Sequence, residues 1–154
     1  MCGEEQARSL RSLNNLAGLF ESKGEYDRAL PLFEECLAKR KRVLGDDHPD
    51  TLASLNNLAV LFYNKGEYDR ALPLFEECLA KSKRVLGDDH PDALSSLNNL
   101  AALFKSKGEY DRALPLYEEC LAKRKRVLGD DHPYTKTTQK SRDICARRLE
   151  ASSA

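Results

Sequence analysis

The stretch SLNNLAVLFYNKGEYDRALPLFEECLAKSKRVLGDDHP, which runs from Ser54 to Pro91, specifies the architecture of the chain. It recurs almost unchanged twice more, beginning at Ser12 with four differences and at Ser96 with five. The period is 42 residues, within the range of about 20 to 50 residues that marks a stacked repeat architecture. The chain therefore contains three repeats and a divergent tail that begins at Tyr134.

Each repeat predicts two amphipathic helices. The first, helix A, places apolar residues at i, i+3, i+4 and i+7; in the second repeat these are Leu55, Leu58, Ala59 and Phe62. The second, helix B, keeps the same spacing through Tyr68, Ala71, Leu72, Phe75, Cys78, Leu79, Val85 and Leu86. Gly66 and Gly87 are expected to end the two helices, because glycine suits the residue after a helix.

Proline breaks the helical rule once in every helix B. Pro73 falls about one turn inside the apolar pattern, where it removes a backbone donor. We therefore expect helix B to start late or to bend at this residue, and likewise at Pro31 and Pro115.

The pattern LxNLAxxF followed by GxYxxAxxxFxxC, from Leu55 to Cys78, resembles the tetratricopeptide repeat, with Cys at the family's usual last Ala position. The 42-residue period and the runs LNNLA, ALPLF and LGDDHP resemble more narrowly the repeats of the kinesin light chain. The resemblance covers about residues 8–133. It implies an all-α fold, a right-handed α-solenoid of stacked helix-turn-helix repeats.

We expect a single domain over residues 1–154, with repeats at about 8–49, 50–91 and 92–133 and a capping helix at about 134–150. In the tail, Arg142 and Asp143 stand where the second repeat has Leu58 and Ala59. A narrow apolar stripe remains, through Thr137, Ile144, Cys145 and Leu149. Such a helix suits the last exposed face of a repeat stack, which has to be polar.

The differences between the repeats gather on one arc of helix A, roughly opposite its apolar stripe. They are Arg11/Ala53/Ser95, Gly18/Val60/Ala102, Glu21/Tyr63/Lys105 and Ser22/Asn64/Ser106. Helix B changes at only two positions, although it has exposed residues too. We interpret the arc as a recognition face, with drift on a solvated surface as the alternative.

In tetratricopeptide superhelices, helix A lines the concave surface, and residues like Asn57 contact the backbone of an extended peptide. The resemblance implies this role for Asn15, Asn57 and Asn99, with Asn14, Asn56 and Asn98 as second choices. An amide both donates and accepts hydrogen bonds, so it suits any peptide backbone. Charge or aromatic selectivity is then expected from Arg11, Glu21, Tyr63 and Lys105, and steric fit from Gly18, Val60 and Ala102; Asn64 completes the expected site. The alternative is that the asparagines join adjacent repeats to each other.

Two other motifs have structural explanations. The motif Asp-Asp-His, ending at His48, His90 and His132, offers metal-ligand types, but the copies lie a repeat apart and each His precedes a helix, so we expect capping rather than zinc. The basic runs, such as KRKR from Lys39 to Arg42, fall in the last turns of helix B, where cations complement the helix dipole.

The composition of the chain argues against several classes of partner. The 25 basic and 25 acidic residues cancel, which provides no electrostatic case for nucleic acid or an anionic membrane. No apolar run reaches the roughly 20 residues of a membrane span, and the repeated cysteines are expected to be free buried thiols. We expect a cytoplasmic protein, not an enzyme, with no cofactor or metal.

We therefore expect a non-catalytic module that binds an extended peptide segment of a partner protein. The competing hypothesis is a structural spacer that self-associates through its repeat ends. The copies are nearly identical, and the sequence predicts no capping helix in residues 1–6 ahead of the first repeat.

Overall fold

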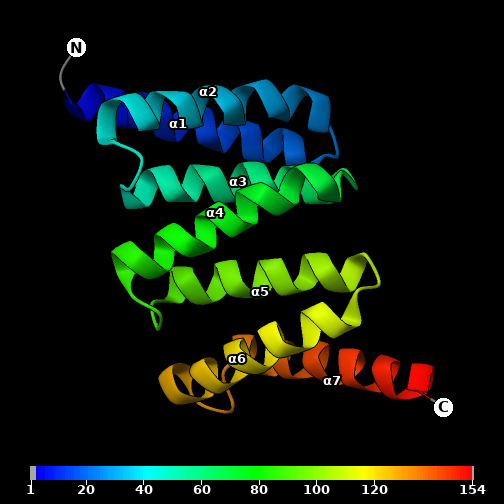
Figure 1. Cartoon of the computed structure of the whole chain (residues 1–154). Helices are drawn as coiled ribbons and strands as arrows, with labels where there is room; N and C mark the ends of the chain where they lie inside the picture. The colour runs from blue at the N-terminus through cyan, green and yellow to red at the C-terminus, as the bar shows by residue number, and fades with distance from the viewer. Residues whose placement is uncertain (1–2, 154) are drawn as a thin grey trace. The chain divides into compact units, whose positions relative to one another are not determined.

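The computed structural model describes residues 3–153, all of whose regular structure is helical (Figure 1). The helices are α1 (Gly3–Ser22), α2 (Tyr26–Leu44), α3 (Pro49–Asn64), α4 (Tyr68–Leu86), α5 (Pro91–Ser106), α6 (Tyr110–Leu128) and α7 (Pro133–Ser153). The chain divides into two compact units, and the boundary falls inside α4, between Leu74 and Phe75. Each unit is described by itself.

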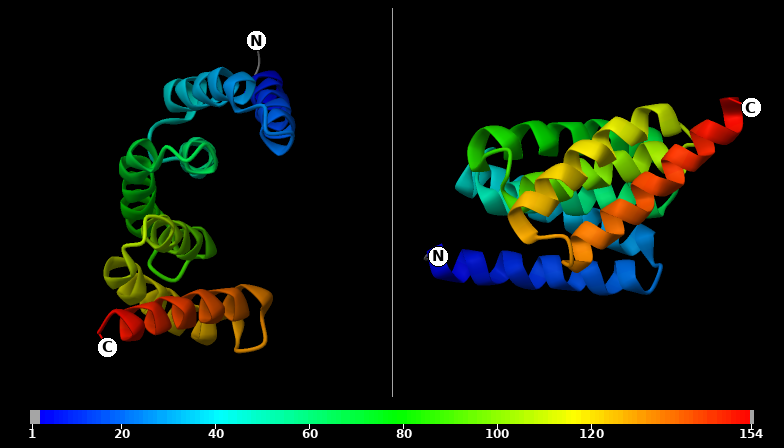
Figure 2. Two further views of the ribbon diagram at one scale, coloured as in Figure 1. Left: turned by 90° about the vertical axis from the view of Figure 1, so that its right-hand side faces the viewer. Right: turned by 90° about the horizontal axis from the view of Figure 1, so that it is seen from below.

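In the first unit α1 packs against α2, and α2 packs against α3. In the second unit α5 packs against α6, α6 packs against α7, and α7 also touches α5. Figure 2 shows α7 crossing α6 on its way to the C-terminus. Helices α1, α3 and α5 are therefore the predicted helices A, and α2, α4 and α6 the predicted helices B. Helix α7 takes the position of a further helix A, which agrees with the predicted capping helix.

The predicted apolar stripe of helix A is confirmed in α3. Leu55, Leu58, Ala59 and Phe62 are all buried. The side chains of Thr51, Ser54 and Leu61 are buried as well. Most of the circumference of α3 is thus covered, and the less buried arc carries the asparagines and the variable positions.

Histidine caps the start of three helices, as the sequence predicts. Nδ1 of His48 accepts a hydrogen bond from the backbone N–H of Asp50 at 3.0 Å. His90 and His132 do the same for the second residue of α5 and α7, each at 3.1 Å. The proline that follows each His has no N–H to satisfy, which suits the first turn of a helix.

A cation–π contact recurs at the turn between the two helices of a repeat. The guanidinium of Arg70 lies 4.2 Å from the ring centroid of Phe62, and Arg28–Phe20 and Arg112–Phe104 share this distance. The turn itself passes through glycine in the left-handed region, for example Gly66 at φ +80°. The contact therefore ties the end of helix A to the first turn of helix B.

Helix B does not start late at its proline, so that part of the prediction was wrong. Helix α2 begins at Tyr26 and continues through Pro31, and α4 and α6 contain their prolines in the same way. Pro31 has no N–H for the carbonyl of Asp27, but both residues are exposed, so water can solvate that carbonyl. Packing of the apolar face keeps the first turn helical.

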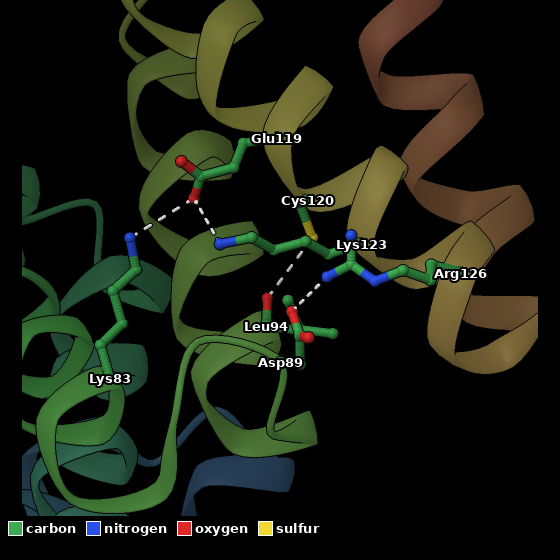
Figure 3. A network of polar contacts seen from close by, with 7 residues as sticks. All are labelled: Lys83, Asp89, Leu94, Glu119, Cys120, Lys123 and Arg126. Atoms are coloured by element: carbon green, nitrogen blue, oxygen red, sulfur yellow. Dashed lines mark hydrogen bonds and ion pairs between the residues drawn. The ribbon is translucent and has the colours of Figure 1, made fainter.

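The repeated cysteines Cys36, Cys78 and Cys120 are buried and free, as predicted, and Cys145 of α7 is buried and free as well. The thiols of Cys36 and Cys78 lie 3.6 and 3.3 Å from the hydroxyls of Ser54 and Ser96, which belong to the next helix A. Cys120 donates to the carbonyl of Leu94 at 3.5 Å (Figure 3). These small side chains therefore fill the layer between successive helices.

The predicted stripe of the capping helix α7 needs one correction. Thr137 is exposed, and its hydroxyl donates to the backbone carbonyl of Pro133 at 2.9 Å. Thr135, Thr138 and Cys145 are the buried residues of α7. A threonine hydroxyl can be buried when it finds a partner; that of Thr138 lies 2.7 Å from Arg124 Nη1.

Candidate functional site

The candidate site is the helix A surface, which we define in each unit by itself as the partly exposed arc that carries the asparagines and the variable positions: on α1 and α3 in the first unit, and on α5 in the second. In the first unit, hydrogen bonds join α1 to α3 at two places. Asn57 Nδ2 donates to Asn14 Oδ1 at 3.0 Å, and Asn64 Nδ2 donates to Glu21 Oε2 at 3.4 Å. The two bonds are seven residues apart on each helix, a separation of about 10 Å along the axis.

Between these two bonds the surface is open at Gly18. A Cβ built on this glycine would meet nothing within 4 Å. Val60, the equivalent residue of α3, is half-buried, whereas Asn15 and Arg11 on α1 are exposed. The first unit thus presents an accessible strip with hydrogen-bonding groups at both ends.

Glu21 is the charged group of this strip. Burial raises the pKa of its carboxyl above the ordinary value, and the hydrogen bond from Asn64 opposes that shift. In residues 3–153 no basic side chain forms an ion pair with this carboxylate. A half-buried carboxylate that has only an amide as its partner gains by meeting a cation from outside.

Tyr63 is the aromatic residue of the helix A surface in the first unit. Its ring centroid lies 5.4 Å from that of Tyr68, and the ring planes are inclined at 49°. This contact holds the Tyr63 ring against the start of α4, and the side chain remains partly accessible. An aromatic ring held in this way loses little conformational freedom when it stacks on a ligand.

In the second unit α7 lies beside the helix A surface of α5. The Thr138 hydroxyl is 3.2 Å from Asn98 Oδ1. Lys105 is half-buried, and its charge partly offsets the effect of burial, which raises the pKa of the Cys145 thiol. Asn99 and Ala102 are half-buried on the same helix.

The structure therefore pairs Asn14 with Asn57 and Glu21 with Asn64 in the first unit, and Asn98 with Thr138 in the second. The bond between Asn14 and Asn57 is a tie between adjacent repeats, which was the alternative explanation of the asparagines. The pairing of Glu21 with Asn64 was not foreseen. The sequence spacing could have predicted this bond, because Glu21 and Asn64 are 43 residues apart, as Asn14 and Asn57 are.

The basic runs at the ends of helix B form ion pairs on the protein's own surface. Lys81 and Glu77 are 2.9 Å apart within α4, as the i, i+4 spacing predicts. In the second unit the carboxylate of Glu119 lies between Lys83 and Lys123 (Figure 3). These lysines therefore have structural partners. No group of three or more potential metal-binding side chains converges within residues 3–153.

The family model of the tetratricopeptide repeat matches residues 8–81 and 56–126. The chain belongs to the tetratricopeptide repeat family. Its 42-residue repeats are similar to those of a putative kinesin light chain of known structure.

The nearly identical TPR-like repeats of a putative kinesin light chain from Podosopora anserina superpose with a TM-score of 0.84 at 27% identity, over 92% of this chain and 67% of that one. A form of the same protein with a single substitution has the same values. BtubC (BKLC) from P. vanneervenii has a TM-score of 0.83 at 24% identity, over 92% of this chain and 56% of that one, and shows the fold alone. No curated protein matches the sequence.

Family membership supports a general role as a protein-interaction scaffold, and the fold is typically non-catalytic. None of the helices in residues 3–153 is long and apolar enough to cross a membrane.

Proposed function

We propose that the helix A surface binds an extended peptide segment of a partner protein, and that the chain is a non-catalytic binding module. One observation carries this proposal: Gly18 leaves open space between the Asn14–Asn57 and Asn64–Glu21 hydrogen bonds. The exposed Asn15 lies on the same helix. A peptide backbone in this space would meet an amide that offers both a donor and an acceptor.

We assign two different roles to the asparagines. Asn14 and Asn57 already bond to each other, so they serve the repeat stack first. Each amide still has further hydrogen-bonding capacity. Asn15 is exposed, which makes it the better candidate for a peptide contact. In the second unit we assign the corresponding contacts to Asn99 and Lys105, with Asn98 in a supporting position; Asn56 has that supporting position on α3 of the first unit.

Selection from a displayed peptide library on the immobilised chain tests this function. The parallel selection uses Asn15→Ala, and Arg42→Ala on the exposed side of α2 serves as the control. We expect a motif that is enriched on the parent and on Arg42→Ala and lost on Asn15→Ala. Equal enrichment on all three proteins would move the site away from the helix A surface, and no enrichment on the folded parent would contradict peptide binding.

The spacer hypothesis has weaker support. End-to-end stacking would place α1 of one chain against the outer side of α7 of another. That side carries Gln139 and Asp143, which bond to each other at 3.0 Å. Polar groups already paired with each other favour water over an apolar neighbour. For the compartment, the free buried thiols fit the cytoplasm, where thiols stay reduced.

A further inference from the structure

Helix α1 exposes two leucines that every other helix A of the repeats buries. Leu16 and Leu19 are 44% and 60% exposed. The residues at the same positions are 7% and 0% exposed in α3 (Leu58, Leu61), and 6% and 0% in α5 (Leu100, Leu103). The sequence around these leucines is nearly the same in all three repeats. The difference therefore lies in what covers the helix.

The inner side of α1 is occupied by its own hairpin partner. Leu10 and Ala17, which lie on that side, are 6% and 0% exposed, and α1 packs against α2. In α3 the same inner residues are buried, and so are Leu58 and Leu61. In the first unit α3 meets both helices of the preceding repeat: it packs against α2, the helix B of that repeat, and hydrogen bonds join it to α1. The uncovered face of α1 is thus the face that receives a preceding repeat, and its Ser12 side corresponds to the side of α3 that meets helix B.

The polar residues of this face are in register with those that bind helix B elsewhere. Ser12 occupies the position of Ser54, whose hydroxyl lies 2.8 Å from Arg40 Nη1 and 3.6 Å from the Cys36 thiol. At the same position in α7, Thr138 accepts from Arg124 at 2.7 Å. Ser12 is exposed. Helix α1 therefore carries both the apolar and the hydroxyl side chains of a helix B receptor.

The opposite end of the repeat series is different. In α7 the positions that would face a following helix B carry polar residues, and Asp143 bonds to Gln139 at 3.0 Å and to Arg142 at 2.8 Å. That end is closed in the manner of a capping helix. Helix α1 shows no such replacement, because Leu16 and Leu19 remain leucine.

We propose that the face of α1 formed by Ser9, Ser12, Leu16 and Leu19 docks an amphipathic helix of the helix B type from a partner protein. The partner helix carries an apolar residue, a small residue three positions later and an arginine four positions after that, as Phe33, Cys36 and Arg40 do in α2. Its apolar side covers the two leucines, and its arginine donates to the Ser12 hydroxyl. This inference does not depend on peptide binding at the helix A surface.

The test titrates the full chain into a fluorescently labelled peptide with the sequence of residues 26–45 and measures anisotropy. We expect saturable binding that Leu19→Lys weakens at least about tenfold, since it places a charge in the apolar contact. Val127→Lys is the matched control, because Val127 is exposed to a similar extent on α6 (43%) and lies outside this face. It should bind like the parent.

Absence of saturable binding, or equal affinity for the parent and Leu19→Lys, would overturn the proposal. Analytical ultracentrifugation of the chain without peptide measures independently whether the chain forms a dimer. A dimer that Leu19→Lys dissociates would show that a second copy, and not a helix B, covers α1. The outcome of the peptide-library selection on Asn15→Ala does not affect the anisotropy titration. Peptide binding at the helix A surface and docking on α1 can therefore be contradicted separately.

Discussion

The side-chain amide of Asn57 donates to that of Asn14 at 3.0 Å and joins helix A of the second repeat to helix A of the first. Asparagine is a mediocre helix former because its amide competes for backbone hydrogen bonds. A bond between two such amides, partly shielded from water, offsets this disadvantage. It also fixes how α1 and α3 lie side by side within the first unit.

Asn57→Ala should lower the free energy of unfolding by about 0.5 to 1.5 kcal/mol, the usual contribution of one hydrogen bond. Asn14→Ala should cost a similar amount, and the double variant should cost less than the sum, because both remove the same bond. Urea denaturation of the four proteins measures this coupling. Additive losses would show that the bond contributes nothing to stability. Asn15→Ala, on an exposed residue, is the control and should change stability little.

Glu21→Gln should make the protein more stable at neutral pH. Burial raises the pKa of this carboxyl in the folded state above its unfolded value. The contribution of the Glu21 carboxyl to the free energy of unfolding is therefore fully present below its unfolded-state pKa, and it is lost as pH rises through its folded-state pKa. The neutral glutamine avoids this loss and can still accept from Asn64. The difference in Tm between variant and parent should grow from pH 3 to pH 7. A difference that is constant with pH would contradict the burial of the charge, and the exposed Glu34→Gln is the control.

His90→Phe should destabilise the start of α5. It removes the Nδ1 acceptor of the Asp92 N–H, and loss of a helix cap costs about 0.5 to 2 kcal/mol. His90→Asn, which restores an acceptor, should recover most of that loss. Amide hydrogen exchange in the first turn of α5, together with Tm, measures the effect. Equal stability of the Phe and Asn variants would show that the cap is unimportant.

The thiols of Cys78, Cys120 and Cys145 should react slowly in the native protein. Burial raises the pKa of each thiol, so little of the reactive thiolate forms. A chromogenic disulfide reagent added to a Cys2→Ser variant should label these cysteines at the rate of unfolding, and labelling should become fast in guanidinium chloride. Rapid labelling without denaturant would show that the layer between the helices opens readily.

Tyr63→Ala should weaken binding of a selected peptide about tenfold, because stacking surfaces of this kind contribute about 0.5 to 1.5 kcal/mol beyond the area they bury. The Tyr63 ring is held at 5.4 Å from that of Tyr68. Isothermal titration of the parent and the variant measures the change, with Val43→Ala at the exposed end of α2 as control. Unchanged affinity would remove Tyr63 from the recognition face.

The repeat period, the helices and their caps could all be predicted from the amino-acid sequence. These features depend on residues close together in the chain: the spacing of Leu55, Leu58 and Phe62, and the hydrogen bond from Asp92 to His90. The local sequence predicted the start of helix B less well at Pro31. Proline disfavours a helical turn there, but side-chain packing keeps this turn helical.

The same local sequence behaves differently in different places because its neighbours in space differ. Leu19 and Leu61 have nearly identical neighbours in sequence, yet one is 60% exposed and the other is fully buried, because α3, unlike α1, has the helices of a preceding repeat against it. The bonds from Asn57 to Asn14 and from Asn64 to Glu21 likewise require two helices whose paired residues are 43 positions apart in the chain. Burial and pairing between repeats depend on which helix lies alongside, and a single repeat does not contain that information.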